Sequence, residues 1–312
     1  MLKHIYFLFY LFFGFSITAR ASVPNVLVTI KPIHSLVAGV MADLKSPTLL
    51  MSGEKSPHTQ HLKPSEVRQI NAAQVVVWVG PSYESALQRI IETPKIGQHI
   101  ITLQEKKGMK LYPMRQGGLW GTHTHGHDEG DSSEHDHNEL DIDGHLWLDP
   151  ENAKAIVRVI AEELSALDPE HQIEYRTNAQ NVISRLEDLD RDLKEVLMPV
   201  REKPYVVYHD GTQYFDRHFK TRGIGVLIGD SHYGINAQHF LQISEYIRDQ
   251  KVSCVFTEPQ FPTDIINSLM DKAGTRIETL DYLGVGLEAD DDAYFLMMRN
   301  LGMAFLKGLG GS

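Results

Sequence analysis

Residues 75–87, VVVWVGPSYESAL, place five consecutive apolar residues directly before a Gly-Pro turn and a stretch with helical spacing of apolar residues. An unbroken apolar run of this length is typical of a strand that is covered on both faces, as in a parallel sheet. Residues 252–266, VSCVFTEPQFPTDII, repeat this order of strand, turn and helix. Further buried strands are predicted at 25–30, NVLVTI, and at 205–208, YVVY. We therefore predict an α/β protein with two similar lobes, each a parallel sheet flanked by helices.

A long helix is predicted between the two halves, over residues 168–200. Asp168 precedes Pro169, as expected at a helix start, and neither Gly nor Pro interrupts residues 170–198. Apolar residues recur at helical spacing through this stretch, and a helix of this length would span about 45 Å, enough to connect two lobes rigidly. Two shorter helices are the alternative. This helix would separate a first lobe at 22–167 from a second lobe at 201–312.

The first 21 residues have the pattern of a secretory signal peptide. Lys3 is followed by an apolar stretch at 5–17, and residues 19–21 offer small side chains around a cleavage site. The apolar stretch is shorter than the roughly 20 residues of a membrane-spanning helix, although an uncleaved anchor is the alternative. A lipid anchor would need a Cys at the cleavage site, and the only Cys is Cys254. We therefore expect a cleaved, freely diffusing protein in an enclosed space such as a periplasm.

Charge and composition restrict the class of partner. With 30 Lys and Arg against 41 Asp and Glu, the chain has a formal charge of −11, which argues against a nucleic-acid binder. The 16 His suggest metal binding, and the single Cys excludes an intramolecular disulfide. Because ordering a loop costs conformational entropy, we expect an acidic, His-rich loop at 117–139 to gather metal ions weakly rather than hold one tightly. This loop contains His123, His125, His127, His135 and His137.

Three His and one Asp lie at turns, where α/β proteins commonly bind their ligands. His58 lies in SPHTQHLKPS at 56–65, and His145 lies in DGHLWLDP at 143–150. His209 follows the strand at 205–208, and Asp281 lies in TLDYLG at 279–284. A single His at a turn is more often a cap or a surface residue than a ligand. Sequence distance does not show whether these four positions meet, so the residues alone leave the site open.

Five motifs in a fixed order carry a more specific signal: SPHTQHLKPSE, DGHLWLDPENA, YHDGTQYF, FTEPQF and LDYLG. The set resembles the metal-binding solute-binding proteins of ABC transporters, and among them those of high-affinity zinc uptake systems. The resemblance implies two α/β lobes joined by one long, rigid helix, with a metal ion held between the lobes. It also implies that His58, His145 and His209 are metal ligands, with Asp281 or water in the fourth position.

The ligand types predict the metal. Three imidazoles with at most one carboxylate suit Zn²⁺, and such a site would also accept Cu²⁺ or Ni²⁺. Mn²⁺ prefers more oxygen ligands, and manganese receptors that resemble this chain tend to carry Glu at the position of His209. We therefore expect a monomeric receptor that captures Zn²⁺ and delivers it to a membrane ABC permease without catalysing a reaction.

Three alternative functions are open for this protein. They are a manganese receptor of the same family, a passive zinc buffer or adhesin, and a secreted zinc hydrolase with Glu258 or Asp210 as general base. The chain has no HExxH or other catalytic motif. We therefore expect Glu258 instead to hold a ligand His in one tautomer.

Overall fold

Most of the chain is described by the structure, which is a computed structural model. The described residues are 22–58, 61–121, 142–228, 237–249, 252–261, 266 and 275–310. The expected signal peptide at 1–21 and residues 122–139 of the His-rich loop lie outside them. Nearly all of the helix predicted after residue 262 also lies outside them.

Two parallel sheets of four strands each form the framework of the described chain. The first has the order β2-β1-β3-β4 and the second the order β6-β5-β7-β8, so the two halves repeat one strand order. The runs quoted at 75–87 and 252–266 supply the third strand of each sheet, which confirms the prediction of two similar α/β lobes. The strands are β1 (Val26–Ile30), β2 (Thr48–Met51), β3 (Val75–Trp78), β4 (His99–Thr102), β5 (Pro204–Val207), β6 (Arg222–Val226), β7 (Cys254–Thr257) and β8 (Arg276–Thr279).

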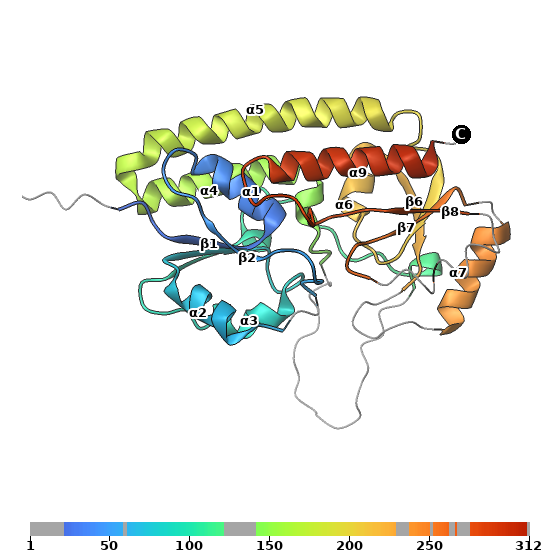
Figure 1. Cartoon of the computed structure of the whole chain (residues 1–312), viewed down its shortest axis with the longest axis horizontal. Helices are drawn as coiled ribbons and strands as arrows, with labels where there is room; N and C mark the ends of the chain where they lie inside the picture. The colour runs from blue at the N-terminus through green and yellow to red at the C-terminus, as the bar shows by residue number, and fades with distance from the viewer. Residues whose placement is uncertain are drawn as a thin grey trace, which may run out of the picture.

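Helices cover both faces of the first sheet, with α2 and α3 on one side and α1 and α4 on the other (Figure 1). This covering explains why every residue of β1 and β3 is buried. The described helices are α1 (Lys31–Val40), α2 (Pro64–Ala72), α3 (Ser85–Ile91), α4 (Pro150–Leu167), α5 (Gln172–Leu197), α6 (Gln213–Phe219), α7 (Ala237–Asp249) and α9 (Ala293–Leu309). Short 3₁₀ turns are η1 (Leu103–Glu105), η2 (Gly118–Trp120), η3 (Leu146–Leu148) and η4 (Pro169–His171).

Helix α5 is the predicted long connection, and it is continuous over 26 residues, or about 39 Å. This rules out the alternative of two shorter helices. The helix begins at Gln172 rather than at Pro169, because the chain from Pro169 to His171 forms a 3₁₀ turn. The Asp168 carboxylate accepts hydrogen bonds from His171 Nδ1 and Tyr175 Oη, which stabilises this tighter start. Helix α5 contacts α1 and α4 beside the first sheet and α6 in the second half of the chain.

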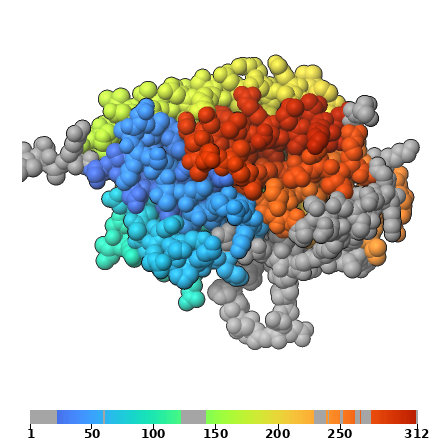
Figure 2. All heavy atoms as spheres, viewed as in Figure 1, coloured from blue at the N-terminus to red at the C-terminus, as the bar shows by residue number. Residues whose placement is uncertain are grey.

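The C-terminal helix α9 closes the junction between the two halves. It packs against α1, α5, β7 and β8, and Figure 2 shows it lying directly against α1 and α5 on one face of the molecule. Buried residues from both halves consequently belong to one continuous apolar core. A second, smaller cluster lies between the second sheet and α7. The lone Cys254 is buried in the larger core, and burial raises the pKa of its thiol to about 12, as expected for an inert residue.

Residues 110–121, which we call the crossing segment, connect the two halves a second time. At its start, Lys110 exchanges backbone hydrogen bonds with the Asn152 side chain on α4. At its end, η2 packs against β6 and α7. A Cβ on Gly225 would come within 2.6 Å of Leu119 Cβ, so a glycine in β6 allows this close approach. Part of the range expected for the first lobe therefore packs on the second sheet.

No helix within the described residues is both long enough and apolar enough to cross a membrane.

Candidate metal centre

Three loops bring His58, His145 and His209 together. His58 lies between β2 and α2, His145 lies directly before η3, and His209 lies two residues beyond the end of β5. One ring nitrogen from each side chain lies within 4.8 Å of the others, and this is the one such group of three or more His, Cys, Asp or Glu among the described residues. The rings of His145 and His209 are 5.1 Å apart between centroids. The structure thus brings together the three predicted His.

Strand register places the partner of His209. In the second sheet β5 and β7 are parallel neighbours, and Val207 pairs with Phe256. His209 and Glu258 each lie two residues beyond this pair, so the two side chains emerge next to each other at the carboxyl edge of the sheet. There His209 Nδ1 donates a hydrogen bond to Glu258 Oε1. This matches the role predicted for Glu258 from the sequence.

A second carboxylate holds His145 in the same way. His145 Nδ1 and its backbone N–H both donate to Asp143 Oδ1, each at 2.9 Å, and Gln213 Nε2 donates to the other carboxylate oxygen at 3.1 Å. Neither Asp143 nor Gln213 was predicted from the sequence to support a ligand. The Asp-Gly-His spacing is a signal that could have identified Asp143, because an Asp side chain readily bonds the backbone two residues later.

These hydrogen bonds determine which ring nitrogens are available. A carboxylate accepts, so the proton of each neutral imidazole resides on Nδ1 and a lone pair remains on Nε2. The Nε2 atoms of His145 and His209 face each other at 3.2 Å. In a tetrahedral site with Zn–N bonds of about 2.0–2.1 Å, two nitrogens lie about 3.3 Å apart. The observed separation therefore suits two ligands of one zinc ion.

The cavity beside the three His is small. Its volume is about 10 Å³, and it is lined by Ser56, Pro57, His58, Tyr83, His145, His209, Glu258, Gln260, Tyr282 and Leu283. A volume of about 10–15 Å³ holds one water-sized particle. The site therefore fits a single ion and excludes an organic solute.

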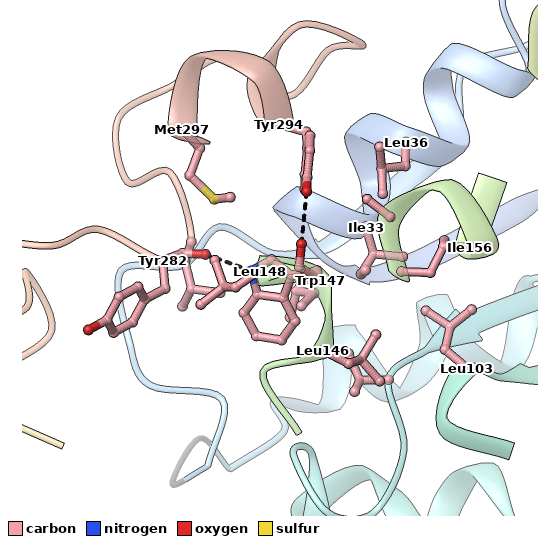
Figure 3. Close-up of a cluster of buried hydrophobic side chains, with 14 of the residues drawn as sticks. Ile33, Leu36, Leu103, Leu146, Trp147, Leu148, Ile156, Tyr282, Tyr294 and Met297 are labelled. Atoms are coloured by element: carbon pink, nitrogen blue, oxygen red, sulfur yellow. Dashed lines mark hydrogen bonds between the residues drawn. The ribbon is translucent and has the colours of Figure 1, made fainter. Parts of the chain in front are cut away.

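Aromatic side chains line the site and restrict the conformation of its backbone. Tyr83 packs edge-on against His58 and His145, with centroids 4.5 and 5.0 Å away. A Cβ at Gly144 would lie 2.5 Å from Tyr83 Cβ, so only glycine allows the chain to pass here. Trp147, fully buried in η3, donates from Nε1 to the Tyr282 carbonyl at 3.0 Å (Figure 3). The buried LWL triplet thereby anchors His145 between the two halves of the protein.

Burial and charge shift the pKa values of the supporting groups. Burial alone would lower the pKa of His209, but the Glu258 carboxylate outweighs burial and raises it. Burial would raise the pKa of Asp143, but its hydrogen bonds from His145 outweigh burial and lower it. Asp143 consequently stays ionised and keeps the Nδ1 proton of His145 in place.

Asp281 lies apart from the three His. Its carboxylate accepts hydrogen bonds from the backbone N–H groups of Leu283 and Gly284, at 3.1 and 2.9 Å. It is neither in the group of converging ring nitrogens nor among the residues that line the cavity. Burial raises the pKa of this carboxyl group. In the observed arrangement Asp281 therefore stabilises its own turn.

Two other His, one on α1 and one shortly before α2, lie in ordinary environments. His61 is exposed. His34 is buried and contacts the Pro47 carbonyl through Nε2 at 3.0 Å. Neither belongs to the converging group.

Comparison with known proteins identifies relatives over most of the chain. The ZnuA family model, described as zinc-uptake complex component A, periplasmic, matches residues 26–307. The high-affinity zinc uptake system protein ZnuA of Brucella abortus is 33% identical over 297 residues, covering 89% of each chain. Its counterpart in Yersinia pestis is 30% identical over 290 residues, covering 91% of each chain.

Solved structures share the fold. A crystal structure of ZnuA superposes with a TM-score of 0.75 at 22% identity, covering 92% of this chain and 100% of that chain. The solute-binding protein FpvC of Pseudomonas aeruginosa, in complex with Mn²⁺, gives a TM-score of 0.74 at 19% identity, covering 93% and 99%. At these identities the structural likeness shows the fold alone, whereas the family model matches the sequence over residues 26–307. The chain therefore belongs to the ZnuA family, the periplasmic component of zinc-uptake complexes.

Proposed function

We propose that this protein is a zinc receptor that binds Zn²⁺ with His58, His145 and His209 and delivers it to a membrane ABC permease. Family membership supports the transport role, because the relatives are named for zinc uptake and not for an enzyme activity. One observation carries the site: the Nε2 lone pairs of His145 and His209 converge at 3.2 Å beside a cavity of about 10 Å³. Without a cation between them, these lone pairs would repel each other.

The fourth ligand position favours water over Asp281. Asp281 is outside the group of converging ligand atoms and does not line the cavity, while the N–H groups of Leu283 and Gly284 hold its Oδ1 in the turn. A carboxylate oxygen of Asp281 would have to move closer to the three imidazoles to bind the same ion. If Asp281 is nevertheless a ligand, its removal will weaken zinc binding as much as removal of a His.

Equilibrium metal competition tests the proposal. The mature protein and the His58→Ala, His145→Ala, His209→Ala and Asp281→Ala variants are titrated with Zn²⁺, Mn²⁺, Cu²⁺ and Ni²⁺ against a chelator. We expect each His variant to lose at least a hundredfold in zinc affinity, and the wild type to prefer Zn²⁺ over Mn²⁺. His99→Ala is the matched control, because His99 also contacts a carboxylate, Glu163, at 2.8 Å.

Two results would contradict the proposal. One is a folded variant lacking any one of the three His that binds zinc as tightly as the wild type. The other is a wild-type preference for Mn²⁺, which would favour the manganese receptor. Growth of a deletion strain that is restored by added zinc would count for transport and against a passive buffer or adhesin.

The site geometry disfavours a hydrolase. Glu258 is engaged by His209, and the Asp210 carboxylate is engaged by Arg115. Each carboxylate therefore already accepts from a protein partner, whereas a zinc hydrolase requires a base that is available to a metal-bound water. Hydrolytic turnover that disappears only in His58→Ala would reverse this conclusion.

We also propose that the exported protein is a monomer without a lipid anchor, cleaved after Ala21. The sequence pattern at 1–21 supports export and cleavage, and the position of the only Cys supports the absence of a lipid anchor. The intact mass of the protein released from the periplasm should correspond to a chain that begins at Ser22. Size-exclusion chromatography with light scattering should give the mass of one chain. A lipid-modified mass or a stable dimer would contradict it.

A further inference from the structure

Arg115, in the crossing segment, donates hydrogen bonds to three residues near the site. Its Nε donates to both oxygens of Asp210, at 3.1 and 2.8 Å, and its Nη2 donates to Asp210 Oδ1 and to Thr212 Oγ1. Its Nη1 donates to Asp216 Oδ2 at 2.7 Å. The guanidinium carbon lies 3.5 Å from the centre of the Trp120 ring. Such a bidentate and stacked arrangement suits Arg and not Lys.

The cluster around Arg115 is buried and charged. The side chains of Arg115, Asp210 and Asp216 are 16%, 11% and 9% exposed. Two carboxylates thus share one guanidinium, while hydroxyl groups of Tyr205, Thr212 and Thr221 complete the hydrogen bonds of Asp216. Removal of the guanidinium would leave two buried negative charges without a cation, which destabilises the observed arrangement of residues 210–216.

Asp210 connects this cluster to the metal ligands, because it directly follows His209. The turn is tight, with the Gly211 N–H donating to the His209 carbonyl at 2.9 Å. A Cβ at Gly211 would lie 2.8 Å from the Tyr282 ring and 3.3 Å from His145 Nε2. A shift of this turn would therefore displace His209 relative to His145.

The same segment also contacts the support of His145. The Asp143 N–H donates to the Tyr112 carbonyl at 2.9 Å, and Gln213 Nε2 bridges the Pro113 carbonyl and Asp143 Oδ2, at 3.0 and 3.1 Å. Residues 112–115 thus contact the Asp143 backbone, the Gln213 side chain that bonds the Asp143 carboxylate, and Asp210, which follows His209. One short stretch of chain therefore contacts the supports of both imidazoles.

We propose that Arg115 is a positioning residue for zinc, which fixes the spacing between His145 and His209 by clamping Asp210 and Thr212 to the crossing segment. It does not touch the ion itself. The inference rests on the proposed function, because it assumes that these two His bind the metal.

The test compares Arg115→Met and Arg115→Lys with a matched control. Arg185→Met is that control, because Arg185 also pairs with two aspartates, Asp291 and Asp292, and lies 4.0 Å over the Phe295 ring, away from the site. Each purified full-length mature variant is measured for zinc affinity by chelator competition and for unfolding in urea. Its Co²⁺ complex is measured for the visible d–d absorption, which reports the ligand geometry.

We expect Arg115→Met to bind zinc at least tenfold more weakly than the wild type and to change the Co²⁺ spectrum. We expect Arg115→Lys to recover part of the affinity, since it restores the charge but not the fork of donors. Arg185→Met should retain wild-type affinity and spectrum even if it unfolds at lower urea. If Arg115→Met does not fold, Arg115→Lys alone should show at least a threefold loss with a changed Co²⁺ spectrum.

The deciding variant is Arg115→Met if it folds, and otherwise Arg115→Lys. The inference is overturned if this variant binds zinc within twofold of the wild type and has an unchanged Co²⁺ spectrum. A wild-type protein that does not bind zinc tightly would instead overturn the proposed function. The two failures are therefore distinguished by the wild-type titration.

Discussion

Substitution of Glu258 by Gln tests how far a residue that does not touch the metal determines zinc affinity. The Glu258 side chain is 6% exposed, and its Oε1 accepts the His209 Nδ1 proton. Glutamine keeps the size and one acceptor oxygen but loses the charge that makes the imidazole more basic. Removal of such a partner typically weakens metal binding tenfold to a hundredfold, which corresponds to about 1.4–2.7 kcal/mol.

The pH dependence of this loss has a definite sign. Glu258 raises the pKa of His209, so at mildly acidic pH protons compete with zinc for this ring in the wild type. Loss of the carboxylate lowers that pKa, and the competition by protons weakens. The affinity difference between Glu258→Gln and the wild type should therefore be larger at pH 8 than at pH 6.

The assay is zinc competition against a chelator at both pH values, with urea unfolding to establish that the variant is folded. Glu163→Gln is the matched control, because Glu163 also accepts from a His, at 2.8 Å from His99 Nε2, but lies outside the site. The reasoning is refuted if Glu258→Gln binds zinc within twofold of the wild type at pH 8. It is also refuted if Glu163→Gln loses as much affinity.

Three further predictions follow from individual contacts. A protonated His cannot bind zinc, and the pKa of His209 is raised. Wild-type zinc affinity should therefore fall as the pH drops, and the fall should begin above the ordinary His pKa of about 6.5. Calorimetry that shows constant affinity between about pH 5 and 7.5 would contradict this prediction. His218 contacts two aspartates, at 2.9 and 2.6 Å, and these carboxylates outweigh burial and raise the pKa of His218. The contribution of His218 to the stability of the fold is therefore complete below about pH 6.5 and is lost as the pH rises through the raised pKa. His218→Gln should therefore lower the free energy of unfolding in urea by about 1–3 kcal/mol at pH 6 and by less at pH 9, and an equal loss at both would count against it. Gly144→Ala should clash with Tyr83, cost about 1–3 kcal/mol in the same assay and weaken zinc binding; unchanged stability would show that the turn yields freely.

Local patterns determined the secondary structure well. The apolar runs at 75–79 and 205–208 became buried parallel strands, because an unbroken apolar run is stable only where both faces are covered. The long helix was also predictable, because its buried residues repeat every three to four positions. Its start was misplaced, because the preference of Asp168 for a helix N-cap was overridden by bonds to His171 and Tyr175.

The site was predictable only in part. The five motifs pointed to His58, His145 and His209, which the structure brings together. They also pointed to Asp281, which the structure places in bonds to its own turn. The sequence could not decide this, because the direction of a carboxylate in a turn depends on backbone geometry that its neighbours along the chain do not specify.

Local patterns along the chain thus specify two series of buried strands, a long helix, and imidazoles at turns. The 3.2 Å separation between the Nε2 atoms of His145 and His209, and the contact of Arg115 with the turn beside them, arise only when distant segments pack together. Arg115 and its two carboxylates are separated by 95 and 101 residues. Such pairs carry no periodic signal, since they meet only through the packing of the crossing segment, which runs from α4 to β6.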